Sequence, residues 1–140
     1  MHMYVPFKYE RINDMADITG VNDYMYTTDD KSGYWQVSMH ESAHTYLGME
    51  WNGETWVWAH LPFGFAPACR LYTLMKQEIY RPLRELGVRM IFLIDDQAGV
   101  ATGQNRAQFQ CRQVVTILAT LGFTLSLTKC QLIPKQTARF

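Results

Sequence analysis

The sequence predicts an α+β fold in which two helices pack on one face of a mainly antiparallel sheet. Short apolar or alternating runs joined by tight turns indicate strands, and two longer segments repeat apolar residues every three or four positions, which is typical of helices. Their order along the chain is strand, hairpin, helix, hairpin, helix, strand, as in a two-layer α+β sandwich. With 140 residues, of which 48% are hydrophobic, the chain is long enough for one domain with its own core.

The N-terminal half is predicted to be mostly extended. Residues 35–39 (WQVSM) alternate apolar and polar side chains, which is typical of a strand with one buried face. Two further strands, 46–51 and 55–60, are expected to form a hairpin, because Asn52-Gly53 between them is a preferred two-residue turn. The other expected elements are a short helix near 12–18, a strand at 25–29 and a turn at 31–34.

The C-terminal half is predicted to contain two amphipathic helices and further short strands. Pro67 suits the first turn of a helix, and Gly87 suits the position just after its end. The second helix is expected over 105–121 and ends before Gly122. Strands are expected at 123–127 and 130–133, and the apolar stripes of the helices consist of Tyr72, Met75, Ile79, Leu83 and Leu86, and of Cys111, Val114, Val115, Leu118 and Leu121.

The segment Arg89–Ala101 (RMIFLIDDQAGVA) is predicted to be a hairpin with Asp95 and Asp96 at its tip, because two apolar runs flank an acidic centre. Neighbouring carboxylates repel each other, and a divalent cation removes this penalty. Oxygen ligands suit Mg²⁺ or Mn²⁺. A strand that ends at Asp29 beside this hairpin would complete a cluster of three carboxylates, close enough to hold two metal ions about 4 Å apart. The alternative is an acidic turn in solvent.

Composition sets broad limits on function. The formal net charge is zero, so the composition shows no excess of basic residues that would indicate a nucleic-acid-binding surface. No apolar run is long enough to span a membrane, and the N-terminus lacks a signal-peptide pattern, so we expect no membrane partner. Three cysteines, Cys69, Cys111 and Cys130, are odd in number and lack metal-ligand spacing, which predicts reduced thiols in an intracellular protein of the cytoplasm or nucleus.

One short motif offers a competing function. Residues 40–44 (HESAH) match HExxH, in which two histidines on one face of a helix bind zinc and the glutamate acts as general base. The flanking residues predict strands instead of a stable helix. In the extended signature, Leu47 stands at the glycine position and Glu50 at the third histidine position. We therefore interpret the segment as a polar connection between strands and keep a zinc hydrolase as a weaker alternative.

Five blocks that follow one another along the chain carry a resemblance to a known family. They are FKYERINDMADI, TTDDKSGYWQVSMHESAHTYLGMEW, LPFGFAPACRLYTLMK, FLIDDQ and LGFTLSLTKCQLIP, and Phe140 falls where a primer-grip motif would begin. In this order they make residues 7–140 similar to the palm of a reverse transcriptase, most closely that of the DIRS group of tyrosine-recombinase retrotransposons. Inside this alignment HESAH is a plain connector.

The resemblance implies a ferredoxin-like or RRM-like polymerase palm. Residues 1–140 would form the palm with partial fingers, and the N-terminal fingers, thumb and RNase H regions of a parent polyprotein would be absent. The implied activity is RNA-directed DNA polymerisation, in which two Mg²⁺ or Mn²⁺ ions assist transfer of a nucleotide from dNTP to a primer 3′-OH. The implied partners are dNTP, an RNA or DNA template with its primer, and those missing regions. The apolar surface that such a palm exposes leaves a homo-oligomer open.

The resemblance also assigns catalytic roles. Asp29 and Asp95 would be the principal metal ligands, with Asp96 assisting. Lys129 would protonate or neutralise the departing pyrophosphate. Asp30 stands where the family usually has leucine, and an alternative register makes Asp30 the catalytic residue.

The remaining implied roles concern substrate binding. Tyr34 would lie under the dNTP sugar and exclude a 2′-hydroxyl, and Phe63 with Gly64 would support base and template. Leu93 stands where the family has an aromatic residue near the primer end, and Cys69 stands where it has proline. These departures support a second alternative, a catalytically inactive palm retained as an interaction or oligomerisation module. The residues expected near the triphosphate are Lys31, Ser32 and Gly33.

Overall fold

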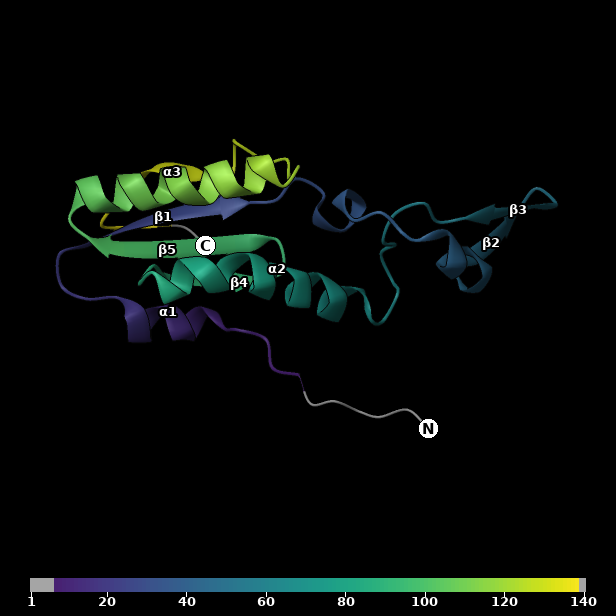
Figure 1. The fold of residues 1–140 in the computed structure, drawn as a ribbon, viewed down its shortest axis with the longest axis horizontal. Coiled ribbons are helices and arrows are strands. Elements are labelled where there is room, and N and C mark those ends of the chain that lie inside the picture. The colour runs from purple at the N-terminus through teal and green to yellow at the C-terminus, as the bar shows by residue number, and fades with distance from the viewer. Residues whose placement is uncertain (1–6, 139–140) are drawn as a thin grey trace.

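The computed structural model describes residues 7–138, so Phe140 and the first six residues lie outside the described part of the chain. A body of sheet and helices carries a two-stranded hairpin that projects from it (Figure 1). Within residues 7–138, no helix has the length and apolar character needed to cross a membrane. The elements are α1 (Ile12–Ile18), β1 (Asp23–Asp29), the 3₁₀ helices η1 (Gly33–Gln36) and η2 (Glu41–Tyr46), β2 (Gly48–Trp51), β3 (Glu54–Val57), α2 (Ala68–Glu85), β4 (Arg89–Leu93), β5 (Asp96–Thr102), α3 (Gln104–Thr120) and β6 (Gln131–Lys135).

The main sheet has four antiparallel strands in the order β4-β5-β1-β6. β1 and β5 lie at its centre and pair without interruption from Asp23 opposite Thr102 to Asp29 opposite Asp96. This register brings the end of β1 beside the start of β5. The acidic residues of two segments that are distant in sequence therefore meet at one end of the sheet.

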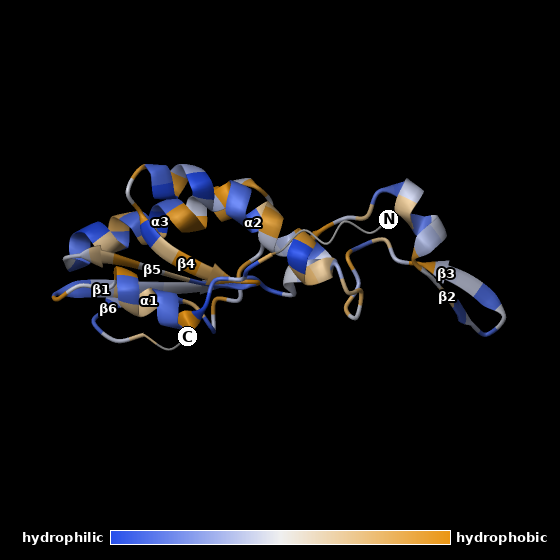
Figure 2. Ribbon diagram, turned by 90° about the horizontal axis from the view of Figure 1, so that it is seen from below, coloured by the Kyte–Doolittle hydropathy of each residue, from blue (hydrophilic) through white to orange (hydrophobic). Residues whose placement is uncertain are grey.

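Helices α2 and α3 cover the same face of this sheet (Figure 2), and α1 packs against β4. The predicted α+β fold is confirmed. Burial of apolar side chains between the two layers is the main stabilising contribution, at about 25 cal/mol per Å². The buried residues of this core are Tyr26, Tyr80, Leu83, Val88, Met90, Phe92, Ala101, Ala107, Cys111, Val114 and Leu118.

Both long helices end at the predicted glycines. Gly87 and Gly122 have φ values of +82° and +87°, a conformation that glycine adopts without the steric cost of a Cβ. The prediction that Leu86 and Leu121 belong to the buried stripes is wrong, since they are 77% and 55% exposed. Each follows the last helical residue, where the chain already turns away from the core.

Two predicted strands do not form. Residues 35–39 fold into η1 and a single bridge between Ser38 and His60. The physical reason is the Gln36 side chain, which donates to the carbonyls of Lys31 and Thr124 and accepts from the Thr124 N–H. These backbone groups are therefore bonded to a side chain and not to a neighbouring strand.

The second missing strand is 123–127, which makes only one bridge, from Leu125 to Asp30. Its backbone groups bond instead to residues around the end of β1: Thr124 O accepts from Lys31 N–H, and Ser126 N–H donates to Asp29 O. The hairpin predicted at 46–51 and 55–60 is confirmed in shorter form as β2 and β3, and its Asn52-Gly53 turn has positive φ at both residues.

The packing of Tyr26 against Gly99 gives a direct test of the sheet. A Cβ on Gly99 would lie 2.2 Å from the Tyr26 ring, because the two residues face each other across β1 and β5. We expect Gly99→Ala to lower the free energy of unfolding by about 1–3 kcal/mol, the usual cost of overpacking. Urea denaturation measures this, with Gly48→Ala on exposed β2 as the control, where a Cβ makes ordinary contacts. Equal stability of the two variants would contradict the packing.

Candidate active site

Two carboxylates meet where β1 ends and β5 begins. Asp29 and Asp96 are opposite residues in the antiparallel ladder, and Asp29 is only 6% exposed. Asp95 precedes Asp96 in the turn after β4, where Ile94 adopts a positive φ of 57°. The Asp95 carbonyl accepts from the Asp30 N–H at 2.9 Å and from Gln97 Nε2 at 2.6 Å. These bonds hold the turn against the end of β1.

The electrostatics at this end of the sheet disfavour a further negative charge. Burial, the neighbouring Asp29 side chain and the charge of Asp95 raise the pKa of Asp96 to about 6. Lys129 is the nearby cation, with its Nζ 3.6 Å from an Asp29 carboxylate oxygen. Of the residues that the structure describes, no three His, Cys, Asp or Glu side chains are arranged as a metal-binding group. The donor set is nevertheless oxygen-only, the chemistry that Mg²⁺ prefers.

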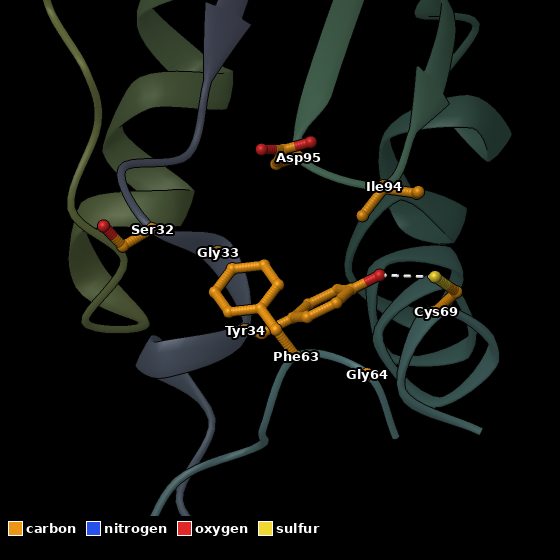
Figure 3. A pocket seen from close by; sticks show the side chains of 8 residues that line it. All are labelled: Ser32, Gly33, Tyr34, Phe63, Gly64, Cys69, Ile94 and Asp95. Carbon is orange, nitrogen blue, oxygen red and sulfur yellow. Dashed lines mark hydrogen bonds between the residues drawn. The ribbon is translucent and has the colours of Figure 1, made fainter. Parts of the chain in front are cut away.

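A cavity of about 380 Å³ opens beside Asp95 (Figure 3). The Tyr34 ring lies between Phe63, at 5.1 Å between centroids, and Tyr72, at 5.4 Å. Its hydroxyl contacts Cys69 Sγ at 2.6 Å, and burial with this contact raises the Tyr34 pKa, so the hydroxyl keeps its proton at neutral pH. The lining residues are Ser32, Gly33, Tyr34, Phe63, Gly64, Cys69, Ile94 and Asp95.

Gly33 permits the close approach that forms this cavity. A Cβ at this position would lie 2.9 Å from the Tyr72 hydroxyl oxygen and 3.2 Å from the Asp95 Cβ. Any side chain would therefore push α2 or the Asp95 turn away from η1. The preceding Ser32 has a φ of 54°, a left-handed conformation that turns the chain from β1 into η1.

The structure divides the predicted site residues into groups. Ser32, Gly33, Tyr34, Phe63, Gly64 and Asp95 line one cavity, whereas Asp29, Asp96 and Lys129 gather at the adjoining end of the sheet. Two predicted residues belong to neither group: Lys31 is exposed and contributes its N–H to Thr124 O, and Leu93 is 36% exposed opposite Asp96.

Asp30 lies apart from this carboxylate group. Its side chain is buried and forms an ion pair with Lys76, at 2.5 Å between Nζ and Oδ2. Tyr72 donates its hydroxyl to the same oxygen at 2.6 Å. The register places Asp29 and not Asp30 opposite Asp96, so the geometry favours Asp29 over the alternative assignment.

The HExxH residues do not form the helix that the zinc chemistry needs. His44 lies in η2, and His40 is the residue that caps it. With three residues per turn, residues four apart point about 120° away from each other, so the two histidines do not share one face. His40 Nδ1 instead contacts the Ser42 hydroxyl and backbone N–H.

Comparison with known proteins identifies the family. The model of the family "Reverse transcriptase (RNA-dependent DNA polymerase)" matches residues 3–140, and the chain therefore belongs to this family. No curated protein matches the chain.

Solved structures show the same fold. The foamy viral protease-reverse transcriptase in complex with dsDNA is 22% identical with a TM-score of 0.74, and covers 97% of this chain and 28% of its own. The same viral protein in complex with an RNA/DNA hybrid is 24% identical with a TM-score of 0.69, covering 79% of this chain and 14% of its own. The sheet with α2 and α3 thus has the fold of the corresponding part of these reverse transcriptases, and the chain spans between about a seventh and just over a quarter of their length.

Sequence reasoning missed several residues that shape the site. Cys69 was singled out only as a departure from the family, yet it lines the cavity and contacts Tyr34. A lysine inside the apolar stripe of α2, four residues after Tyr72, was a usable signal for the buried Lys76, since charged residues are rarely buried unless paired. Gln97 gave no comparable signal, because a polar residue after two aspartates looks like part of a turn.

The raised pKa of Asp96 predicts a pH-dependent effect of Asp96→Asn without metal. A carboxyl with a folded pKa near 6 and an unfolded pKa of about 4 makes folding less favourable as pH rises through this window. We expect Asp96→Asn to be more stable than the parent at pH 7, by up to about 1 kcal/mol after solvent screening, and equally stable near pH 4. Urea denaturation in EDTA measures this, with exposed Asp17→Asn as the control. A destabilised variant at pH 7 would contradict the electrostatics.

Proposed function

We propose that the chain is the palm, with part of the fingers, of a longer RNA-directed DNA polymerase that adds nucleotides from dNTP to a primer 3′-OH. The observation that carries this proposal is the position of Asp29 opposite Asp96, with Asp95 beside the aromatic cavity. Carboxylates next to a cavity of about 380 Å³, which is within the size range of ligand pockets, are the arrangement that metal-assisted nucleotidyl transfer needs. Membership of the reverse transcriptase family supports the same activity.

The carboxylates Asp29, Asp95 and Asp96 would hold two Mg²⁺ or Mn²⁺ ions. The fit is supported by the oxygen-only donor set and by the raised pKa of Asp96, which burial, the Asp29 side chain and the charge of Asp95 cause together and which bound cations would lower. When bound, such ions lower the pKa of the primer hydroxyl and neutralise charge on the phosphates.

The other side chains would position the nucleotide. Tyr34 lines the cavity, and its ring packs against Phe63 and Tyr72, so it is suited to lie under the sugar and exclude a 2′-hydroxyl. Phe63 is 62% exposed beside Gly64 and offers an apolar surface to a base. Lys129, 68% exposed at its side chain, would donate a proton to pyrophosphate or neutralise it. Lys31, Ser32 and Gly33 would lie near the triphosphate.

Tight binding of primer and template would depend on regions outside this chain. The foamy viral relatives are described with an RNA/DNA hybrid and with dsDNA, which supports a nucleic-acid partner of either kind here. The net charge of zero predicts weak affinity for the isolated chain, because phosphate contacts dominate such binding. Within the family we propose the DIRS group, on the strength of the five sequence blocks.

Primer extension on an RNA template tests the proposed activity. We expect Mg²⁺- or Mn²⁺-dependent extension by the chain, and at least a 100-fold loss in Asp95→Asn, since removing a principal metal ligand abolishes the alignment of substrates. The matched control, Asp17→Asn on exposed α1, should leave extension unchanged.

Two outcomes would contradict the proposal. Equal extension by the parent chain and Asp95→Asn would place the activity elsewhere. A folded chain that shows neither extension nor metal-dependent dNTP binding would favour the inactive palm, for which the departures at Leu93 and Cys69 were the sequence argument.

A further inference from the structure

A buried ion pair lies next to the turn that contains Asp95. Lys76 and Asp30 have fully buried side chains, and Lys76 Nζ is 2.5 Å from Asp30 Oδ2. Three aromatic rings surround the ammonium group, with Nζ at 4.4 Å from the ring centroid of Phe123, 5.3 Å from that of Tyr80 and 5.7 Å from that of Tyr72. The Tyr80 hydroxyl oxygen also accepts from Nζ at 3.2 Å. The aromatic faces and the carboxylate together compensate the charge of Lys76.

Stability alone gives little reason for this pair. Withdrawing two charges from water is costly, and apolar residues of similar volume often serve a core equally well or better. One oxygen of Asp30, Oδ1, is moreover buried and finds no hydrogen-bond partner among residues 7–138. A buried polar group that lacks a partner adds a cost of its own.

The pair is connected to the catalytic turn through Gln97, which is 1% exposed. Gln97 Nε2 donates to Asp30 Oδ2 at 3.2 Å and to the Asp95 carbonyl at 2.6 Å. Its Oε1 accepts from the Thr28 hydroxyl on β1 at 2.5 Å. The same turn contains Ile94 at positive φ, which costs energy for a β-branched residue and persists only where the surroundings enforce it.

We propose that Asp30, Lys76 and Gln97 are positioning residues that fix the Asp95 turn against the end of β1, so that Asp29, Asp95 and Asp96 are held ready for divalent cations. This inference rests on the proposed function for the identity of the metal-binding carboxylates. Lys76 also holds the Asp30 carboxylate in the core, where its charge does not compete with Asp29 for the cations. The three residues touch no reacting atom and act through the backbone of Asp95.

The double variant Asp30→Leu/Lys76→Met tests the proposal, because it removes both charges and fills nearly the same volume. We expect the variant to fold with at most a modest decrease in melting temperature, since apolar replacement of a buried pair is often neutral. The decrease would come from the buried Tyr72 hydroxyl, which loses its acceptor. Hydrogen exchange of the peptide covering residues 93–98 should become faster, and Mn²⁺ affinity, measured by electron paramagnetic resonance of free Mn²⁺, should fall about 10-fold or more, as is typical when groups supporting metal ligands are removed.

A control pair lies at the other end of the same strand. Asp23 and Arg89 form an ion pair at 2.7 Å where β1 begins, so Asp23→Leu/Arg89→Met disturbs the sheet far from Asp29. We expect this variant to lose stability while exchange at 93–98 and Mn²⁺ affinity stay at parental values. This contrast separates local positioning from general stability.

A second variant keeps the test decisive if the double variant does not fold. Gln97→Met leaves the ion pair intact and removes the side-chain bond to Asp95, and it should reproduce the faster exchange and the weaker Mn²⁺ binding. Parental exchange at 93–98 in the folded variants, or parental Mn²⁺ affinity despite faster exchange, would overturn the proposal. A parent chain that binds no Mn²⁺ would instead refute the proposed function, and the exchange rates would still decide whether these residues fix the turn.

Discussion

The antiparallel register between β1 and β5 is the constraint on which the site depends. It places Asp29 opposite Asp96 and Tyr26 opposite Gly99, so one ladder sets both the carboxylate group and the packing of the core. A shift by one residue would move every side chain of β1 to the other face of the sheet. The helices α2 and α3 resist such a shift, because they bury the apolar side chains of that face.

At the end of β1, the carboxylates on the two faces of the sheet differ in how their negative charge is compensated. On one side, burial and the neighbouring Asp29 and Asp95 raise the pKa of Asp96 to about 6, a situation that cations would relieve. On the other side the charge of Asp30 is already compensated by Lys76 within the core. Consecutive aspartates therefore have separate environments, because successive side chains of a strand point to opposite faces. The site thus combines a carboxylate group whose charge is incompletely compensated with the Asp30 carboxylate, whose charge is compensated by Lys76.

Local sequence patterns predicted those helices and strands whose formation depends mainly on the residues within them. Apolar periodicity located α2 and α3, the Asn52-Gly53 turn located the projecting hairpin, and the flanking apolar runs located β4 and β5. The same reasoning failed at 35–39, because the Gln36 side chain bonds to Thr124, a residue 88 positions away. The Asp30–Lys76 pair was missed as well. Helical spacing indicates that Lys76 faces the core, but it does not indicate which residue of a distant strand lies opposite it. The carboxylate group was predicted as an assembly of distant segments, whereas the contact of Cys69 with Tyr34 required coordinates.

The most direct test of the account is to locate a bound divalent cation on the folded chain. Nuclear magnetic resonance with substoichiometric Mn²⁺ reports the distance of each backbone amide from the ion through paramagnetic broadening. We expect broadening confined to residues 29–31, 94–97 and 126–130, and its loss in Asp95→Asn. Broadening centred on His40 and His44, or an equal pattern in Asp95→Asn, would contradict the claim that the carboxylates at the end of β1 form the metal site.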